Sequence, residues 1–256
     1  MSATIFITGA SAGIGEALAL EFARRGYSIA VAARRLEKLT ALGERLQAAG
    51  AAAVLPLELD VAELPAVPVA LAAARERFGR LDVVVANAGV GLYTPVGRGK
   101  LEEVRQTFAT NVLGAIATIE AALPILRAQS GGQVVGISSI AAWRGMSGLG
   151  AYCASKAALH RYLQAVRAEV HGEGIAVTEL APGYIDTEMN RGTGTRPFVI
   201  PVERGAAIMA RLIERRVGYR MVPALPWTLF APLLALAPTA WLAPRRRPGG
   251  GNQRPS

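Results

Sequence analysis

Two periods of apolar residues alternate along most of this chain. Short runs rich in β-branched residues are typical of buried strands, and longer segments with an apolar residue every three or four positions are typical of amphipathic helices. The short runs predict strands at residues 3–8, 28–33, 53–59, 81–86, 133–138, 175–180 and 219–222. The longer segments predict helices that end at residue 26, span 36–49, 67–78 and 101–128, run from about 152 to about 171, and span 202–216.

Strands that alternate with helices pair in parallel through right-handed crossovers. The pattern therefore predicts one doubly wound α/β domain at residues 1–222, with a largely parallel sheet of seven strands. Ligands of such sheets bind beyond the carboxyl ends of the strands, so the residues that follow each strand are the candidates for a site.

The composition allows a single large core. Apolar residues make up 52% of the 256 residues, and the mean hydropathy of +0.31 excludes wholesale disorder. Cys153 is the one cysteine, so no intramolecular disulfide forms, which suits a reducing compartment. The amino terminus shows no pattern of a signal peptide, and we expect a cytoplasmic protein.

The net charge of +9 suggests nucleic acid as a partner, but its distribution argues against one. Many of the basic residues gather late in the chain, at 211–220 and in the Pro/Gly-rich stretch 245–256. No interleaving of basic and aromatic residues, of the kind that stacks bases, is visible. We therefore expect no nucleic-acid partner.

A glycine-rich turn follows the first strand and precedes a helix. It contains Gly9, Ser11, Ala12, Gly13, Ile14 and Gly15. Glycines let the backbone approach a pyrophosphate, and the helix N-terminus supplies free N–H groups, so the turn predicts a dinucleotide site. The alternative is a turn that serves chain geometry alone.

The ends of the next strands carry polar residues that fit the same ligand. The second strand ends in Ala33-Arg34-Arg35, without the carboxylate that would hold the ribose of NAD, and arginines fit a 2′-phosphate, which favours NADP. Arg35 equally suits the start of a solvated helix. Asp60-Val61 and Asn87-Ala88-Gly89 follow the third and fourth strands, where simple turn chemistry is the alternative.

Tyr152 and Lys156 lie four residues apart, which places both on one face of the predicted helix. An ammonium beside a phenol is expected to lower its pKa, so the pair predicts a proton-transfer device; a surface pair without function is the alternative. Ser138 and Ser139 end a strand shortly before, where hydroxyls could bind a carbonyl. Asn111 lies within a predicted helix, where asparagine is unfavourable and needs a reason.

Together these motifs resemble the short-chain dehydrogenases/reductases over about residues 3–222. The matching stretches, in the family's order, are Thr8 to Gly15, Asn87-Ala88-Gly89, Asn111, Ser139, Tyr152-Cys153-Ala154-Ser155-Lys156 and Pro182-Gly183-Tyr184-Ile185-Asp186-Thr187. Ala86 departs from the family, which more often has asparagine there. The resemblance implies a Rossmann-type fold and a nicotinamide cofactor.

The resemblance also implies roles for single residues. Tyr152 would be the general acid and base, Lys156 would lower its pKa and hold the nicotinamide ribose, and Ser139 would bind the substrate oxygen. Asn111 would position a water in a proton relay. Asp60 and Val61 would meet adenine, Asn87 to Gly89 would flank the cofactor, and the carboxamide side would be covered by Pro182, Gly183, Ile185 and Thr187. Arg34 would be the better partner of the 2′-phosphate.

The expected function is NADP(H)-dependent interconversion of a ketone or aldehyde with an alcohol, with NADPH preferred over NADH and no metal. The substrate is expected to be lipophilic, because the end of the chain adds apolar surface near the cleft. The family implies a homodimer or homotetramer, commonly through the helices that bear Asn111 and Tyr152. The alternative is an NADP-binding redox sensor or scaffold without turnover.

Beyond residue 222 the chain departs from the family's minimal form. Residues 223–244 carry no charge, and their length exceeds a bilayer span, but prolines at 226, 232, 238 and 244 each disrupt a continuous helix. Three hypotheses remain open: peripheral membrane contact through 223–247, an apolar flap over the cleft, or an oligomer contact. Residues 192–195 suit hinges of a substrate lid, and 245–256 suit a disordered tail.

Overall fold

The computed structural model describes residues 2–190 and 196–238. Its main sheet has seven strands in the order β3-β2-β1-β4-β5-β6-β9, and every neighbouring pair is parallel. The strands are β1 (Thr4–Thr8), β2 (Ser28–Ala33), β3 (Ala53–Glu58), β4 (Val83–Ala86), β5 (Gly132–Ile137), β6 (Ile175–Pro182) and β9 (Tyr219–Val222). The prediction of a doubly wound, seven-stranded parallel sheet is confirmed.

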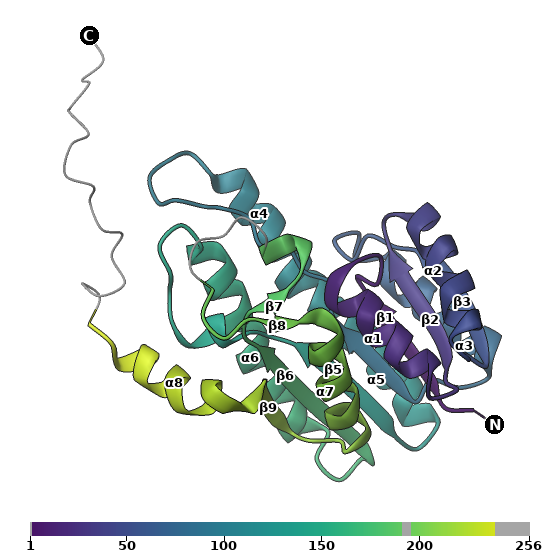
Figure 1. The fold of residues 1–256 in the computed structure, drawn as a ribbon. Coiled ribbons are helices and arrows are strands. Elements are labelled where there is room, and N and C mark those ends of the chain that lie inside the picture. Colours follow the sequence, from purple (N-terminus) through teal and green to yellow (C-terminus); the bar gives the residue numbers. More distant parts are fainter. Residues whose placement is uncertain (1, 191–195, 239–256) are drawn as a thin grey trace.

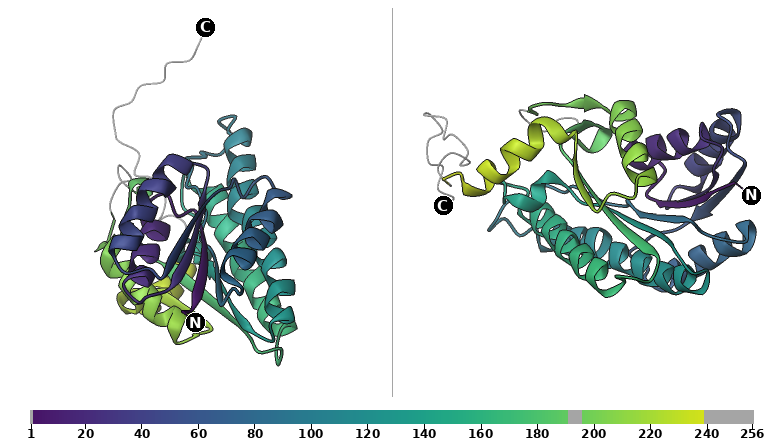
Figure 2. Two further views of the ribbon diagram at one scale, coloured as in Figure 1. Left: turned by 90° about the vertical axis from the view of Figure 1, so that its right-hand side faces the viewer. Right: turned by 90° about the horizontal axis from the view of Figure 1, so that it is seen from below.

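Helices cover both faces of this sheet (Figures 1 and 2). One face carries α1 (Gly13–Ala23), α2 (Leu36–Ala48) and α7 (Val202–Glu214). The other carries α3 (Ala66–Phe78), α5 (Ala115–Ala128) and α6 (Gly150–Glu169). The remaining short elements are α4 (Leu101–Phe108), η1 (Ala109–Gly114), η2 (Ile140–Trp143), β7 (Ile185–Asp186), η3 (Glu188–Asn190) and β8 (Ile200–Pro201).

Alternation along the strands divides the core into two layers. Ile5 and Ile7 of β1 pack on the face of α1 and α7, whereas Phe6 between them packs on the face of α3 and α5. Successive strand residues point to opposite faces, and a sheet covered on both sides is apolar on both. This explains the unbroken apolar runs that predicted the strands.

The predicted helix at 101–128 is interrupted by a π-helical turn, η1, around Asn111. The Asn111 side chain bonds both main-chain groups of Val90: its Nδ2 donates to the carbonyl oxygen at 2.9 Å, and its Oδ1 accepts from the amide at 2.8 Å. These bonds are the reason that an asparagine sits within the helix. Among the described residues, the segment 101–128 is also the one helical stretch long and apolar enough to cross a membrane, but half of its apolar window is buried inside the domain.

The chain continues after β9 as helix α8 (Ala224–Leu236), which lies along the outside of the domain (Figure 1). A non-helical residue, Leu225, kinks its start before Pro226, as a proline there predicts. The helix then continues through Pro232, so the expectation that each proline disrupts it is wrong at that position. The predicted hinges at 192–195 and the predicted tail at 245–256 lie outside the described residues.

Candidate active site

A cavity of about 320 Å³ opens at the carboxyl ends of the strands. The predicted site residues that line it are Gly9, Ser11, Ala12, Gly13, Ile14, Arg34, Arg35, Asp60, Val61, Asn87, Ala88, Gly89, Ser139, Tyr152, Lys156, Pro182, Gly183, Ile185 and Thr187. Gly15 and Asn111 do not line it, but each contacts a residue that does, Asn87 and Val90 respectively. The fold thus brings the glycine turn and the Tyr152 pair into one cavity.

The glycine turn needs glycine for steric reasons. Gly9 has φ of +66°, and a β-carbon there would lie 2.7 Å from Cα of Ala88. A β-carbon on Gly15 would lie 2.6 Å from Nδ2 of Asn87. That amide in turn donates to the carbonyl oxygen of Thr8 at 2.8 Å. Asn87 therefore clamps the turn from the neighbouring strand, a role that the sequence analysis did not assign.

The start of α1 fits a phosphate group. The helix begins at Gly13, and no side chain caps its first amides. Uncapped N–H groups and the helix dipole favour an anion, and the glycine backbone leaves room for close approach. On this observation the residues present fit the pyrophosphate of a dinucleotide.

The two arginines after β2 make different contacts. Arg35 donates from Nη2 to Oγ of Ser11 at 2.9 Å, and so contacts the glycine turn. Arg34 approaches Asp60, with Nη1 3.9 Å from Oδ2. Asp60 also accepts a hydrogen bond from the amide of Ala62, which is the turn chemistry considered as an alternative for it. Its contact with adenine stays a prediction.

Tyr152 and Lys156 stand on α6 at the wall of the cavity, with Nζ 5.9 Å from the centre of the phenol ring. The ammonium is buried and donates to the carbonyl oxygen of Ile137 at 2.9 Å. Burial lowers the pKa of Lys156 to about 8. Burial also raises the pKa of Tyr152, and a hydrogen bond with Ser139 offsets this only in part. Desolvation of the phenolate is the largest influence on the Tyr152 pKa, and Lys156 is not among the groups that shift it here, so lowering of that pKa by the ammonium stays a prediction.

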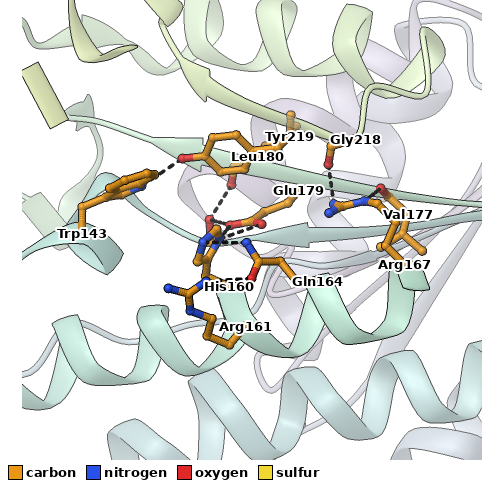
Figure 3. A network of polar contacts seen from close by, with 11 residues as sticks. Trp143, His160, Arg161, Gln164, Arg167, Val177, Glu179, Leu180, Gly218 and Tyr219 are labelled. Carbon is orange, nitrogen blue, oxygen red and sulfur yellow. Dashed lines mark hydrogen bonds and ion pairs between the residues drawn. The ribbon is translucent and has the colours of Figure 1, made fainter. Parts of the chain in front are cut away.

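The two serines at the end of β5 have different surroundings. Oγ of Ser139 caps η2 by accepting from the amide of Ala141 at 3.1 Å, and Ser139 also bonds Tyr152. Ser138 instead donates from Oγ to Oε1 of Glu179 at 2.7 Å. Glu179 is buried and faces His160, whose Nδ1 lies 2.8 Å from Oε1, between α6 and β6 (Figure 3). Ser139 Oγ also donates to the carbonyl oxygen of Pro182 at 3.4 Å. Ser139 is therefore the serine that lies beside the phenol, and its contact with a substrate oxygen stays a prediction.

Asn111 is fully buried beside the cavity. Besides Val90, its Nδ2 contacts Oγ of Ser155 at 3.0 Å. A β-carbon on Gly89 would lie 3.3 Å from Oδ1 of Asn111 and 3.4 Å from Nζ of Lys156. The missing side chain of Gly89 therefore lets both groups lie close to the main chain that lines the cavity. These contacts give Asn111 a structural role, and its placement of a relay water stays a prediction.

Several residues that line the cavity are not among those predicted from the sequence. They are Leu59, Val90, Thr110, Ile137, Glu188 and Met189, and Ser138 and Ala33 also line the cavity. Most of them adjoin a predicted site residue, so their neighbourhood in the sequence could have found them. Met189 gave no such signal, because it reaches the site from the segment after β7 and packs on Gly91. Among residues 2–190 and 196–238, no group of three His, Cys, Asp or Glu side chains is placed to hold a metal ion.

Comparisons with known proteins agree with this geometry. The family model described as short chain dehydrogenase matches residues 3–197. An uncharacterized oxidoreductase of Myxococcus xanthus is 41% identical over 230 residues, which cover 90% of this chain and 89% of the relative. The NADP-dependent 3-hydroxy acid dehydrogenase of Schizosaccharomyces pombe is 34% identical over 189 residues, 73% of each chain. The structure of an alcohol dehydrogenase from Thermococcus sibiricus, complexed with 5-hydroxy-NADP, has a TM-score of 0.79 at 30% identity and covers 86% of this chain and 96% of its own.

Proposed function

We propose an activity on one premise: the chain belongs to the short-chain dehydrogenase family and is an oxidoreductase. The proposed reaction is the NADP(H)-dependent interconversion of a ketone or aldehyde with an alcohol. The observation that carries it is the single cavity that holds both the glycine turn at Gly9 and the Tyr152, Ser139 and Lys156 side chains. The turn that would hold a dinucleotide and the tyrosine that would serve its reaction thus line one space.

When bound, the nicotinamide supplies the hydride, and the protein supplies position and protons. Tyr152 holds its proton at neutral pH because burial raises its pKa, so it is loaded to protonate a carbonyl oxygen in the reductive direction. Ser139 donates to the same oxygen as negative charge develops there. Lys156 uses one N–H on the carbonyl oxygen of Ile137, which leaves it donors that would hold the cofactor ribose.

The preference for NADP rests on the cations after β2. Arg34 and Arg35 both line the cavity, and no carboxylate follows β2 until Glu37. A guanidinium binds a phosphate through paired, charge-assisted hydrogen bonds. The Schizosaccharomyces pombe relative is NADP-dependent by name, which supports the same choice.

The substrate is proposed to be lipophilic. Val90, Ile185 and Met189 give apolar walls to the cavity that also holds Tyr152. Helix α8 adds Trp227 directly behind Gly183, which lines the same cavity. We further propose a cytoplasmic homodimer or homotetramer that associates through the helices bearing Asn111 and Tyr152.

The test is a panel of aliphatic, aromatic and steroid ketones with NADPH and then NADH, followed by loss of cofactor absorbance. A Tyr152→Phe variant should lose at least about 100-fold in kcat, since general acid catalysis contributes that much, and should still bind NADPH. An unchanged rate in the variant contradicts the proposal. Absence of turnover with every ketone, together with tight NADPH binding, favours the sensor or scaffold instead.

A further inference from the structure

Helix α8 is apolar on every side, and its described side chains divide into a group that the domain buries and a group that it leaves exposed. Trp227 and Ala231 are buried against Ala181 and Met221. The exposed group includes four leucines with 63% to 83% of their surface exposed. They are Leu225, Leu229, Leu233 and Leu236. A helix that is apolar all round normally lies in a core or against a membrane. We therefore expect another apolar surface to cover the exposed leucines.

The exposed residues form one continuous strip. Leu229, Leu233 and Leu236 follow each other at intervals of four and three residues, which stacks them along one helix face. Phe230 and Phe198 extend the strip sideways, with ring centroids 5.5 Å apart and both rings about half exposed. The segment of Phe198 lies next to β8, so the strip joins two parts of the chain that are distant in sequence.

Positive charge follows this strip closely in the sequence. No charged residue occurs from Met221 to Pro244, and three arginines follow at once at 245–247. Eight residues lie between Leu236 and the first of them, so the connection spans at most about 30 Å of extended chain. The arginines lie outside the described residues, but this length keeps them within reach of any surface that the leucines touch.

We propose that this leucine face docks α8 on an anionic lipid bilayer, lying in its interface. Thirteen residues of helix are about 20 Å long, too short to span the hydrocarbon core. Interfacial binding needs apolar area and nearby cations, which this segment provides. A specific protein partner would normally also require polar contacts to set its register. The one hydroxyl of this helix, Thr228 Oγ1, already donates to Ala224 at 2.8 Å.

The experiment is co-sedimentation of the full chain with vesicles of phosphatidylcholine alone and of phosphatidylcholine mixed with phosphatidylglycerol. The wild type should bind the anionic vesicles at least about tenfold more tightly, since each arginine near such a surface contributes measurably. The double variant Leu229→Ser/Leu233→Ser should weaken binding at least about tenfold, because two exposed leucines leave the lipid. Replacement of Arg245, Arg246 and Arg247 by glutamine should remove the preference for anionic vesicles.

A matched control removes equally exposed apolar residues elsewhere. Val69 and Leu101 are 68% and 80% exposed, and Val69→Ser/Leu101→Ser should bind vesicles like the wild type. Vesicle binding that the α8 variant leaves unchanged overturns the proposal, and so does a wild type that does not sediment. A second outcome would assign the leucine face to another copy of the chain instead. The wild type would then form an oligomer in buffer without binding vesicles, and the α8 variant would convert that oligomer to smaller species. If the leucine variant unfolds, the arginine variant carries the test alone. None of these readouts depends on turnover.

Discussion

The indole nitrogen of Trp227 occupies the space into which a β-carbon on Gly183 would project. Gly183 lines the cavity directly after β6, and Trp227 belongs to α8, beyond the last strand of the sheet. That nitrogen is buried and has no hydrogen-bond partner among the described residues, so packing alone holds the ring there. The segment after residue 222 is therefore coupled mechanically to the wall of the site.

This contact predicts that Gly183→Ala forces the indole away. We expect a loss of about 1–3 kcal/mol in the free energy of unfolding, measured by urea titration, because overpacking a filled position costs that much. The control Gly145→Ala, with no atom within 4 Å of the added carbon, should cost far less. The double variant Gly183→Ala/Trp227→Ala should lose less stability than the sum of the two single losses, since the added carbon meets no indole once Trp227 is removed. Additive losses would contradict the coupling.

Substitutions of Gly9 in the glycine turn and of Gly79 elsewhere should cause similar backbone strain but have different effects on cofactor binding. Gly9 and Gly79 both have positive φ, +66° and +79°, but only at Gly9 would a β-carbon meet other atoms, Ala88 foremost. We expect Gly79→Ala to cost about 1 kcal/mol of stability and to leave NADPH affinity unchanged. Gly9→Ala should abolish NADPH binding in a fluorescence titration. Equal cofactor affinity in the two variants would show that the turn does not hold the dinucleotide.

Substitution of the two arginines after β2 should affect the Kd of NADPH and the Kd of NADH differently. Arg34→Ala should raise the Kd of NADPH about tenfold or more and leave that of NADH unchanged, since a lost charged hydrogen bond contributes about 1.5–3 kcal/mol. Arg35→Ala should weaken both cofactors, because Arg35 also bonds Ser11 in the glycine turn. A preference of the wild type for NADH would refute the role given to Arg34.

Lys156 predicts a dependence of stability on pH. Burial lowers its pKa from 10.5 to about 8 in the folded protein. Below pH 8 Lys156 is protonated in both the folded protein and the unfolded chain, and the folded protein is destabilised by its buried ammonium. Between pH 8 and about 10.5 only the unfolded chain is protonated at Lys156, so the free energy of unfolding should rise with pH by up to about 3 kcal/mol. We expect this rise as the difference between the wild type and Lys156→Met in urea titrations at several pH values; a constant difference would contradict the buried cation.

Much of this protein could be predicted from its sequence because the signals are local. Apolar periods of two kinds predicted every strand of the main sheet, and Gly9, Asn87, Ser139, Tyr152 and Lys156 were each found from the type and spacing of nearby residues. Parallel pairing then brings the ends of the strands to one edge of the sheet, so the motifs converge on one cavity.

The tertiary structure alone decided what depends on packing between distant parts of the chain. Burial of Tyr152 raised its pKa, and the contact of Ser138 with Glu179 left Ser139 as the serine beside the phenol. The bonds of Asn111 to Val90 explain its place in a π-helical turn, and Trp227 reached Gly183 from beyond the last strand. Sequence spacing fixes neighbours along one element, but desolvation and close approach depend on which elements are packed together, and that is settled only when the chain has folded.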